Sequence, residues 1–161
     1  MSQVTRMSSN FCAERPFVEA VIAELRGLGA EIDRLDQAAA DRFGVNRTDL
    51  RCLELLSAAR EMAPTALAAA LGFTTGGVTT VIDRLERAGY ARRRPDPRDR
   101  RRLVVEATEL LAARETEIFG EILRSSRALA ASYSDAELVT IRDFLARTRA
   151  IISVEGNLAR P

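Results

Sequence analysis

Histidine, lysine and tryptophan are absent from this chain of 161 residues, and only two cysteines occur. Without histidine there is no imidazole to serve as a general base, to complete a Ser-His triad or to ligate a metal. Without lysine there is no P-loop, and no Gly-x-Gly-x-x-Gly motif follows a predicted strand. Cys12 and Cys52 lack the spacing of a zinc or disulfide framework. The sequence therefore predicts a protein that is not an enzyme, with no metal site and no cofactor.

Long apolar runs are also missing, because no stretch approaches the roughly eighteen residues that a membrane span needs. No signal peptide is recognisable at the N-terminus, so we expect a cytoplasmic chain with no membrane partner. Aromatic residues make up 5% of the chain, whereas hydrophobic residues make up 47%. This composition is sufficient for one aliphatic core, which predicts a single domain.

The most informative segment begins with a short helix. Its apolar residues recur with helical spacing and form one stripe that must face a core: Val78, Val81, Ile82 and Leu85. The remaining faces carry small and polar residues, which are Thr75, Gly76, Gly77, Thr79, Thr80, Asp83, Arg84 and Arg87. Each glycine costs a helix about 1 kcal/mol relative to alanine, so close approach to another molecule is the expected reason for the pair. A surface helix with a solvated polar face would show the same pattern.

A hairpin that concentrates positive charge follows this helix. Residues 92–102 contain seven arginines and two aspartates, and Leu103 begins the returning strand. Residues 74–108 carry a net charge of +4, whereas the whole chain carries +1. A nearly neutral protein with one positive tip has the electrostatic footprint of a local phosphate contact. Asp99 lies two residues before Arg101 and is expected to aim its guanidinium through a bidentate pair.

Three motifs in and around this segment resemble the MarR family of bacterial transcription regulators. Residues 96–101 read Asp-Pro-Arg-Asp-Arg-Arg, like the wing of that family, and residues 85–90 match its Leu-Glu-x-x-Gly-hydrophobic break. Residues 67–72 match the Leu-Ala-x-x-Leu-Gly of its preceding helix. The resemblance covers about residues 17–155. One departure is Ala107, where the family commonly has leucine.

The remaining pattern predicts helices almost throughout. A long helix is expected to end before Gly44, and Asn46 with Asp49 resembles a capping box that opens the next one. Pro64 suits a first helical position, Gly72 closes the helix that follows, and Thr74 or Thr75 should cap the recognition helix. Another long helix is expected over 109–131, and Ser134 opens a capping box for the last.

The predicted fold class is therefore mainly α with a small β-hairpin wing, a winged helix-turn-helix with long N- and C-terminal dimerisation helices. Residues 1–16 are expected to form a flexible arm, and 17–161 a single MarR-like domain. Within that domain, 17–43 and 109–156 would supply the dimerisation helices, and 46–108 the DNA-binding lobe.

Two heptad-like seams support the dimerisation helices. Residues alternate spacings of three and four in both. The first seam is Val21, Leu25, Leu28 and Ile32, and the second is Leu138, Ile141, Leu145, Thr148 and Ile152, all apolar except Thr148. These seams could pack on each other within one monomer. The resemblance implies instead that they interlock between two subunits, and a homodimer would double the interface on a pseudo-palindromic operator.

The resemblance also implies a small anionic aromatic or lipophilic effector, bound between the dimer helices and the DNA-binding lobe. Phe17, Val21 and Arg51 are the candidate lining residues, with Arg51 as a counter-ion for a carboxylate. Some members of the family sense oxidants through a cysteine, a role that is open to Cys12 near Arg15, whereas Cys52 is expected to be a buried structural thiol.

Together these features predict a sequence-specific DNA-binding regulator, with a ligand-relieved repressor implied by the resemblance. Base edges would be contacted by Gly76, Gly77, Thr79, Thr80 and Asp83, and phosphates by Thr75, Arg84 and Arg87. Arg101 would enter the minor groove with Arg98 and Arg100 beside it. The alternative is a winged-helix module that binds protein. The arginines of the hairpin favour phosphate, because Tyr90, the aromatic residue beside them, is expected to pack inward.

Overall fold

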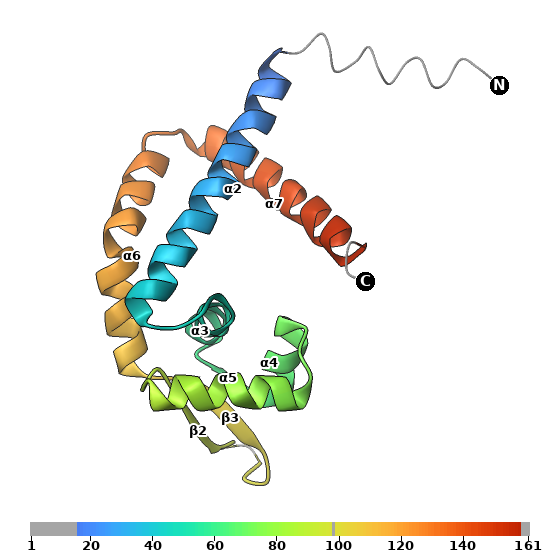
Figure 1. Cartoon of the computed structure of the whole chain (residues 1–161). Helices are drawn as coiled ribbons and strands as arrows, with labels where there is room; N and C mark the ends of the chain where they lie inside the picture. The colour runs from blue at the N-terminus through green and yellow to red at the C-terminus, as the bar shows by residue number, and fades with distance from the viewer. Residues whose placement is uncertain (1–15, 98, 159–161) are drawn as a thin grey trace, which may run out of the picture. The chain divides into compact units, whose positions relative to one another are not determined.

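The computed structural model describes residues 16–97 and 99–158, and for residues 154–158 the backbone alone. These residues form six helices and three short strands (Figure 1), in the order α2 (Pro16–Phe43), α3 (Arg47–Ala59), β1 (Glu61–Met62), α4 (Pro64–Leu71), α5 (Thr75–Arg87), β2 (Ala91–Pro95), β3 (Leu103–Ala107), α6 (Glu109–Ala130) and α7 (Asp135–Leu158). The predicted fold class, mainly helical with a small β wing, is confirmed. The expected arm lies outside the described residues except for Pro16, which already begins α2.

The chain divides into two compact units, the first ending at Arg114 and the second beginning at Glu115. The first contains α2 to β3 and the initial turns of α6, and the second contains the rest of α6 and α7. The expectation of one domain over 17–161, with its lobe at 46–108, stays a prediction.

Local signals set the ends of most helices. Asn46 caps α3 by accepting the N–H of Asp49 at 2.9 Å, and Gly72 ends α4 with a left-handed backbone (φ 70°). Of the two candidates for the cap of α5, Thr74 makes the contact, since its hydroxyl accepts the N–H of Gly77 at 3.2 Å. The capping box at Ser134 forms as expected, because its N–H donates to the Glu137 carboxylate at 2.8 Å.

The wing is a three-stranded antiparallel sheet with the order β1-β3-β2. In the hairpin, Ala91 pairs with Ala107 and Pro95 with Leu103. Strand β1 was not predicted from the sequence. It is only two residues long and pairs Met62 with Val105. A strand of two residues has no measurable periodicity, so only its partner strand reveals it.

The core of the first unit is aliphatic and lies between α3, α4, α5 and the sheet. The predicted stripe on α5 is confirmed, because Val78, Val81, Ile82 and Leu85 are all buried. Tyr90 also packs inward, and its hydroxyl donates to the carbonyl of Phe43 at 3.1 Å. The rings of Tyr90 and Phe43 pack edge to face, with their centroids 5.4 Å apart. The start of the wing is thereby attached to the end of α2.

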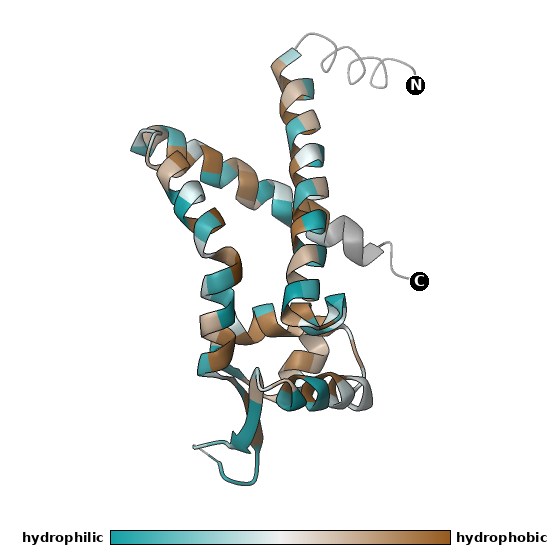
Figure 2. Ribbon diagram, turned by 60° about the vertical axis from the view of Figure 1, so that its left-hand side comes forward, coloured by the Kyte–Doolittle hydropathy of each residue, from teal (hydrophilic) through white to brown (hydrophobic). Residues whose placement is uncertain are grey.

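Several seam residues are exposed in the structure of one chain. Val21, Leu28 and Ile32 on α2 are exposed, as are Ile141, Leu145 and Ile152 on α7, whereas Leu25 and Leu138 are half-buried. In Figure 2 the hydrophobic colour recurs along the described part of α7. The predicted dimer is not tested by one chain, but these side chains are available for it.

Within residues 16–97 and 99–158, no single helix is long and apolar enough to cross a membrane. Helices α4 and α5 pass that test only as a pair, by length and composition, and they are bent by 106°.

The side chain of Cys52 is fully buried on α3, as predicted for a structural thiol, while Cys12 lies outside the described residues. Burial, and secondarily the nearby Asp49 carboxylate, raises the pKa of the Cys52 thiol from 9.0 to about 11. A low-pKa, reactive thiolate at this position is therefore disfavoured.

This shift predicts a measurable pH dependence of stability. The thiol stays protonated in the folded chain while it ionises in the unfolded chain, so its contribution is complete below pH 9.0 and is lost as the pH rises toward 11. Urea unfolding across this range should show wild type losing up to about 1.4 kcal/mol per pH unit relative to Cys52→Ala. If wild type and Cys52→Ala lose stability equally as the pH rises, burial does not raise the pKa of the Cys52 thiol.

Candidate nucleic-acid interface

The outward face of α5 is small and polar. Gly76, Thr79 and Thr80 are exposed, and the two threonine hydroxyls donate back to the carbonyls of Thr75 (2.9 Å) and Gly76 (3.5 Å). A hydroxyl that donates to its own helix still has oxygen lone pairs that accept hydrogen bonds. This face therefore offers acceptors and methyl groups on a narrow helix surface, as contact with base edges in a major groove requires.

Internal packing does not explain the two glycines of α5. A Cβ added to Gly76 would meet nothing within 4 Å, and one added to Gly77 would make ordinary contacts with Thr74 and Phe73 at 3.4 and 3.7 Å. Neither residue has a positive φ. Because glycine costs a helix about 1 kcal/mol relative to alanine, the pair is better explained by the approach of an external surface.

Gly76→Ala is therefore expected to separate stability from DNA binding. It should raise the free energy of unfolding by about 1 kcal/mol through helix propensity. DNA affinity should fall several-fold, because the new methyl group occupies the space of the approaching duplex. Gly27→Ala on α2 is the matched control, since its Cβ also meets nothing within 4 Å. If both variants retain full affinity in the same titration, this face of α5 does not approach DNA.

The inner arginines of the wing are neutralised by acidic residues. Glu106 accepts from Arg92, its cross-strand partner in the hairpin, and from Arg94. These two arginines lower the pKa of the Glu106 carboxyl. Arg94 also pairs with Glu61 of β1. The short strand that the sequence did not reveal thus supplies an acid that compensates the wing.

Arg93 attaches the wing to α5. Its backbone N–H donates to the Glu86 carboxylate at 2.7 Å, and its guanidinium pairs with both Glu86 and Asp83, the latter at 2.7 Å. Asp83 was predicted to accept a hydrogen bond from a base, and that prediction is untested. In the free protein its carboxylate is engaged by Arg93.

The arginines at the tip of the wing, unlike the inner ones, are not compensated by acidic residues within the described ranges of the chain. Arg100, Arg101 and Arg102 are exposed and form no ion pair with any residue that the structure describes. Arg98, the fourth arginine of the tip, lies outside the described residues. Asp99 accepts the main-chain N–H of Arg101 at 3.1 Å, so the observed contact shapes the bend and does not hold the guanidinium as anticipated. Uncompensated positive charge is therefore concentrated at the tip, in the segment that Figure 2 colours hydrophilic.

Arg84 and Arg87 were both predicted to contact phosphates, and the structure gives each a protein partner. Arg87 donates from Nε to the carbonyl of Asp83 at 3.1 Å and remains on the surface. Arg84 donates from Nε and Nη2 to the two carboxylate oxygens of Asp49, at 2.8 and 2.5 Å.

From the sequence, Asp49 was predicted only to take part in a helix cap. Its side chain is 3% exposed, and Asp49 is the one buried charged residue among those that the structure describes. The available signal was its place on the face of α3 that also carries Leu53 and Leu56, at helical spacing. A carboxylate on an apolar face requires a charged partner, which the sequence did not identify.

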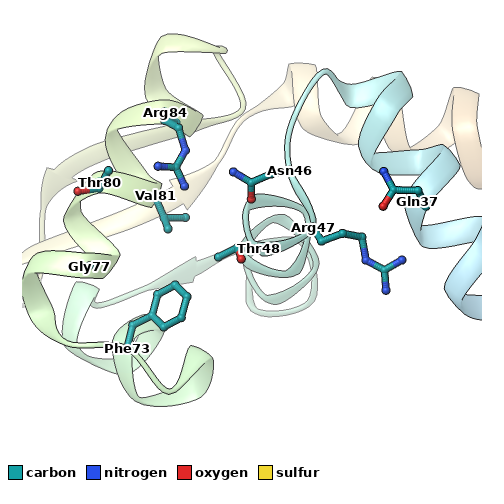
Figure 3. Close-up of a pocket in the computed structure, with 9 residues that line it drawn as sticks. All are labelled: Gln37, Asn46, Arg47, Thr48, Phe73, Gly77, Thr80, Val81 and Arg84. Carbon is teal, nitrogen blue, oxygen red and sulfur yellow. The ribbon is translucent and has the colours of Figure 1, made fainter.

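An open hollow of about 710 Å³ lies beside the recognition helix, between α2, α3 and α5 (Figure 3). It is lined by residues that include Gln37, Asn46, Arg47, Phe73, Thr80 and Arg84. None of the predicted effector residues lines it.

Within one chain, Arg51 on α3 lies far from the other two predicted effector residues, Phe17 and Val21, which share α2. Phe17 is 83% exposed at the start of α2, and roughly 35 Å of helix separates it from Ala40, where α2 is buried near α3. Arg51 on α3 is paired with Glu54 at 2.7 Å. No cluster of three or more cysteine, aspartate or glutamate side chains in the described part of the chain could hold a metal ion.

Comparison with known proteins agrees with this geometry. The model of the MarR family matches residues 43–102, which contain α3 to β2 and the bend of the wing. The uncharacterized HTH-type transcriptional regulator YcgE of Bacillus subtilis (strain 168) is 35% identical over 130 residues, or 81% of this chain and 84% of the relative. The chain belongs to the MarR family. It is therefore an HTH-type transcriptional regulator and not an enzyme, as predicted.

Solved structures show the same fold at lower sequence identity. A mutant of MepR from a multidrug-resistant clinical isolate of Staphylococcus aureus superposes with a TM-score of 0.65 at 18% identity, over 86% of this chain and 99% of that one. NadR in complex with 4-hydroxyphenylacetate has a TM-score of 0.57 at 20% identity, over 79% and 89%. The winged helix-turn-helix of the MarR family is thus confirmed as the fold.

Proposed function

We propose that this MarR-family regulator binds a pseudo-palindromic operator as a homodimer and reads its sequence. The observation that carries the proposal is the distribution of charge on the DNA-binding lobe. The inner arginines of the wing are compensated by acids, whereas the wing arginines without an acidic partner among the described residues lie at its tip. The same lobe carries the small, open face of α5. A local phosphate or minor-groove contact beside a major-groove helix requires this distribution.

The residues divide into base-reading and backbone-contacting groups. Gly76, Gly77, Thr79 and Thr80 would approach base edges, and Arg100 and Arg101 would enter the neighbouring minor groove with Arg98. Thr75, the first residue of α5, would contribute its N–H to a phosphate, because the N-terminus of a helix favours anions. Arg87 would hold a phosphate from the exposed end of α5.

The exposed seams on α2 and α7 support the dimer. A recognition helix contacts few base pairs, so a second copy related by twofold symmetry is needed for a specific operator. The α7 seam provides a shallow apolar groove that includes Leu138, Ile141 and Leu145 and is bordered by Arg142 and Arg149. Burial of this groove against a second copy would remove its apolar surface from water.

The effector is a further part of the proposal. An anionic aromatic or lipophilic compound would relieve repression by favouring a dimer conformation in which the two recognition helices no longer match the operator. NadR, solved with a carboxylate-bearing aromatic ligand, supports this chemical class. Phe17, Val21 and Arg51 remain the candidate residues, with the guanidinium of Arg51 exposed enough to receive a carboxylate.

Selection from a randomised duplex pool at near-physiological salt tests the proposal. Sequencing of the retained DNA should reveal an enriched pseudo-palindrome with half-sites about 10 base pairs apart. A parallel selection with 4-hydroxyphenylacetate, as a probe of the ligand class, should retain less of that sequence. If refolded, ligand-free protein enriches no sequence, the protein-interaction hypothesis replaces DNA binding. The burial of Tyr90 removes the aromatic side chain that such a module would have presented beside the wing.

A further inference from the structure

Asp49 cannot touch DNA, yet it is bonded directly to the recognition helix. Both of its carboxylate oxygens accept from Arg84 of α5, and one of them also accepts from the side-chain nitrogen of Asn46 at 3.1 Å. The same Asn46 caps α3 through its side-chain oxygen. The buried carboxylate therefore joins the first turn of α3 to the second half of α5.

The first turn of α3 is itself held to α2. Arg47 donates to the carbonyl of Asp33 at 2.7 Å and pairs with the carboxylates of Asp33 and Asp36 at 3.2 and 3.4 Å. In Figure 3, Asn46 and Arg47 lie between the side chains of α5 and Gln37 of α2. The partner that holds Arg84 is thus not a freely moving loop but a helix end anchored on both sides.

Directional side-chain contacts hold α5 from two sides. Arg93 of β2 pairs with Asp83 and Glu86 of the helix. From the other side, Arg84 of the helix pairs with Asp49 of α3. The buried stripe of valine, isoleucine and leucine packs against the core through apolar contacts that have no directional preference of their own. A bidentate guanidinium–carboxylate pair forms two parallel hydrogen bonds, so both the distance and the relative orientation of the two groups are restricted. The pair therefore fixes the orientation of the helix on the side of α3, as Arg93 does on the side of the wing.

We infer that Asp49 is a positioning residue that, through Arg84, sets the orientation in which α5 presents Gly76, Thr79 and Thr80 to DNA. This inference rests on the proposed operator binding and deepens it. It also gives Arg84 a role in place of a phosphate contact. Loss of the pair should therefore lower affinity for the operator more than affinity for random DNA. Non-specific binding depends on phosphate charge and tolerates a reoriented helix.

The first test is Asp49→Asn in the full-length protein, titrated with the selected operator and with a random duplex. Operator affinity should fall about tenfold or more while affinity for the random duplex is unchanged or rises, since one negative charge is lost. Glu54→Gln is the matched control, because it removes one acid from the same helix at an exposed ion pair with Arg51. It should change both affinities by the same factor and leave their ratio unchanged.

A second variant keeps the test independent of folding defects. The double substitution Asp49→Leu with Arg84→Met replaces the pair by apolar residues and leaves the net charge unchanged, and such replacements of buried ion pairs are often neutral or stabilising. Asn46 is exposed, so water can satisfy its side chain. Specificity should stay about tenfold below wild type even where thermal unfolding is unchanged.

The outcomes separate the two proposals. If the double variant regains the wild-type ratio of specific to non-specific affinity, the pair is merely structural and the inference is wrong. If operator and random duplex lose affinity equally in the double variant, Arg84 is a phosphate contact and the inference is again wrong. If wild type selects no operator, the proposed function fails, and the inference fails with it.

Discussion

Replacement of Arg101 by alanine is expected to lower operator affinity at least about tenfold, equivalent to ~1.4 kcal/mol, and to leave thermal unfolding unchanged. The Arg101 side chain is exposed at the wing tip and forms no ion pair with the described residues, so its removal costs the folded chain nothing. Its guanidinium would lose its contacts with the minor groove and the neighbouring phosphates. Fluorescence anisotropy with the selected operator gives the affinity, and a thermal melt gives the stability.

Arg92→Ala is the matched control for Arg101→Ala. It removes the same charge from the same hairpin, but the Arg92 side chain is paired with Glu106. Arg92→Ala should change operator affinity by less than about threefold. Only Arg101→Ala should reduce the steepness of the plot of log affinity against log salt concentration by about one. Equal losses in the two variants would mean that the wing acts only through its total charge.

Leu145→Glu is expected to convert the proposed homodimer to a monomer at micromolar concentration. The Leu145 side chain is 46% exposed in one chain and lines the apolar groove of α7. A carboxylate at this point would be buried against a second copy without a dedicated partner, which opposes association strongly. Loss of one half-site contact should then reduce operator affinity by about 100-fold or more, since each half-site supplies several kcal/mol. Light scattering reports the mass, and the same anisotropy titration reports the affinity.

Thr140→Glu provides the control for this substitution. Thr140 is exposed on the same helix but does not line the groove, and its hydroxyl bonds only to the carbonyl of Ala136. This variant should remain dimeric and bind the operator as wild type does. A dimeric Leu145→Glu protein would place the interface elsewhere than on the α7 groove.

The sequence by itself determined the helices, their ends and the identity of the family. Apolar residues at helical spacing, the caps at Asn46, Thr74 and Ser134, and the glycine that closes α4 act within one or two turns of chain. Interactions over such short separations follow from residue type and spacing alone. The open face of α5 and the basic hairpin were predictable for the same reason, since both are contiguous in sequence.

Only the tertiary structure decided which charges are free. Arg94 meets Glu61 across 33 residues of sequence and Arg84 meets Asp49 across 35, through packing of separate elements. The charge count from the sequence weighted all seven arginines of residues 92–102 equally. In the structure, acidic residues compensate Arg92, Arg93 and Arg94. An ion pair between residues far apart in sequence forms only where the fold brings their two segments together. Burial of the whole core determines that arrangement, and no local sequence pattern encodes it.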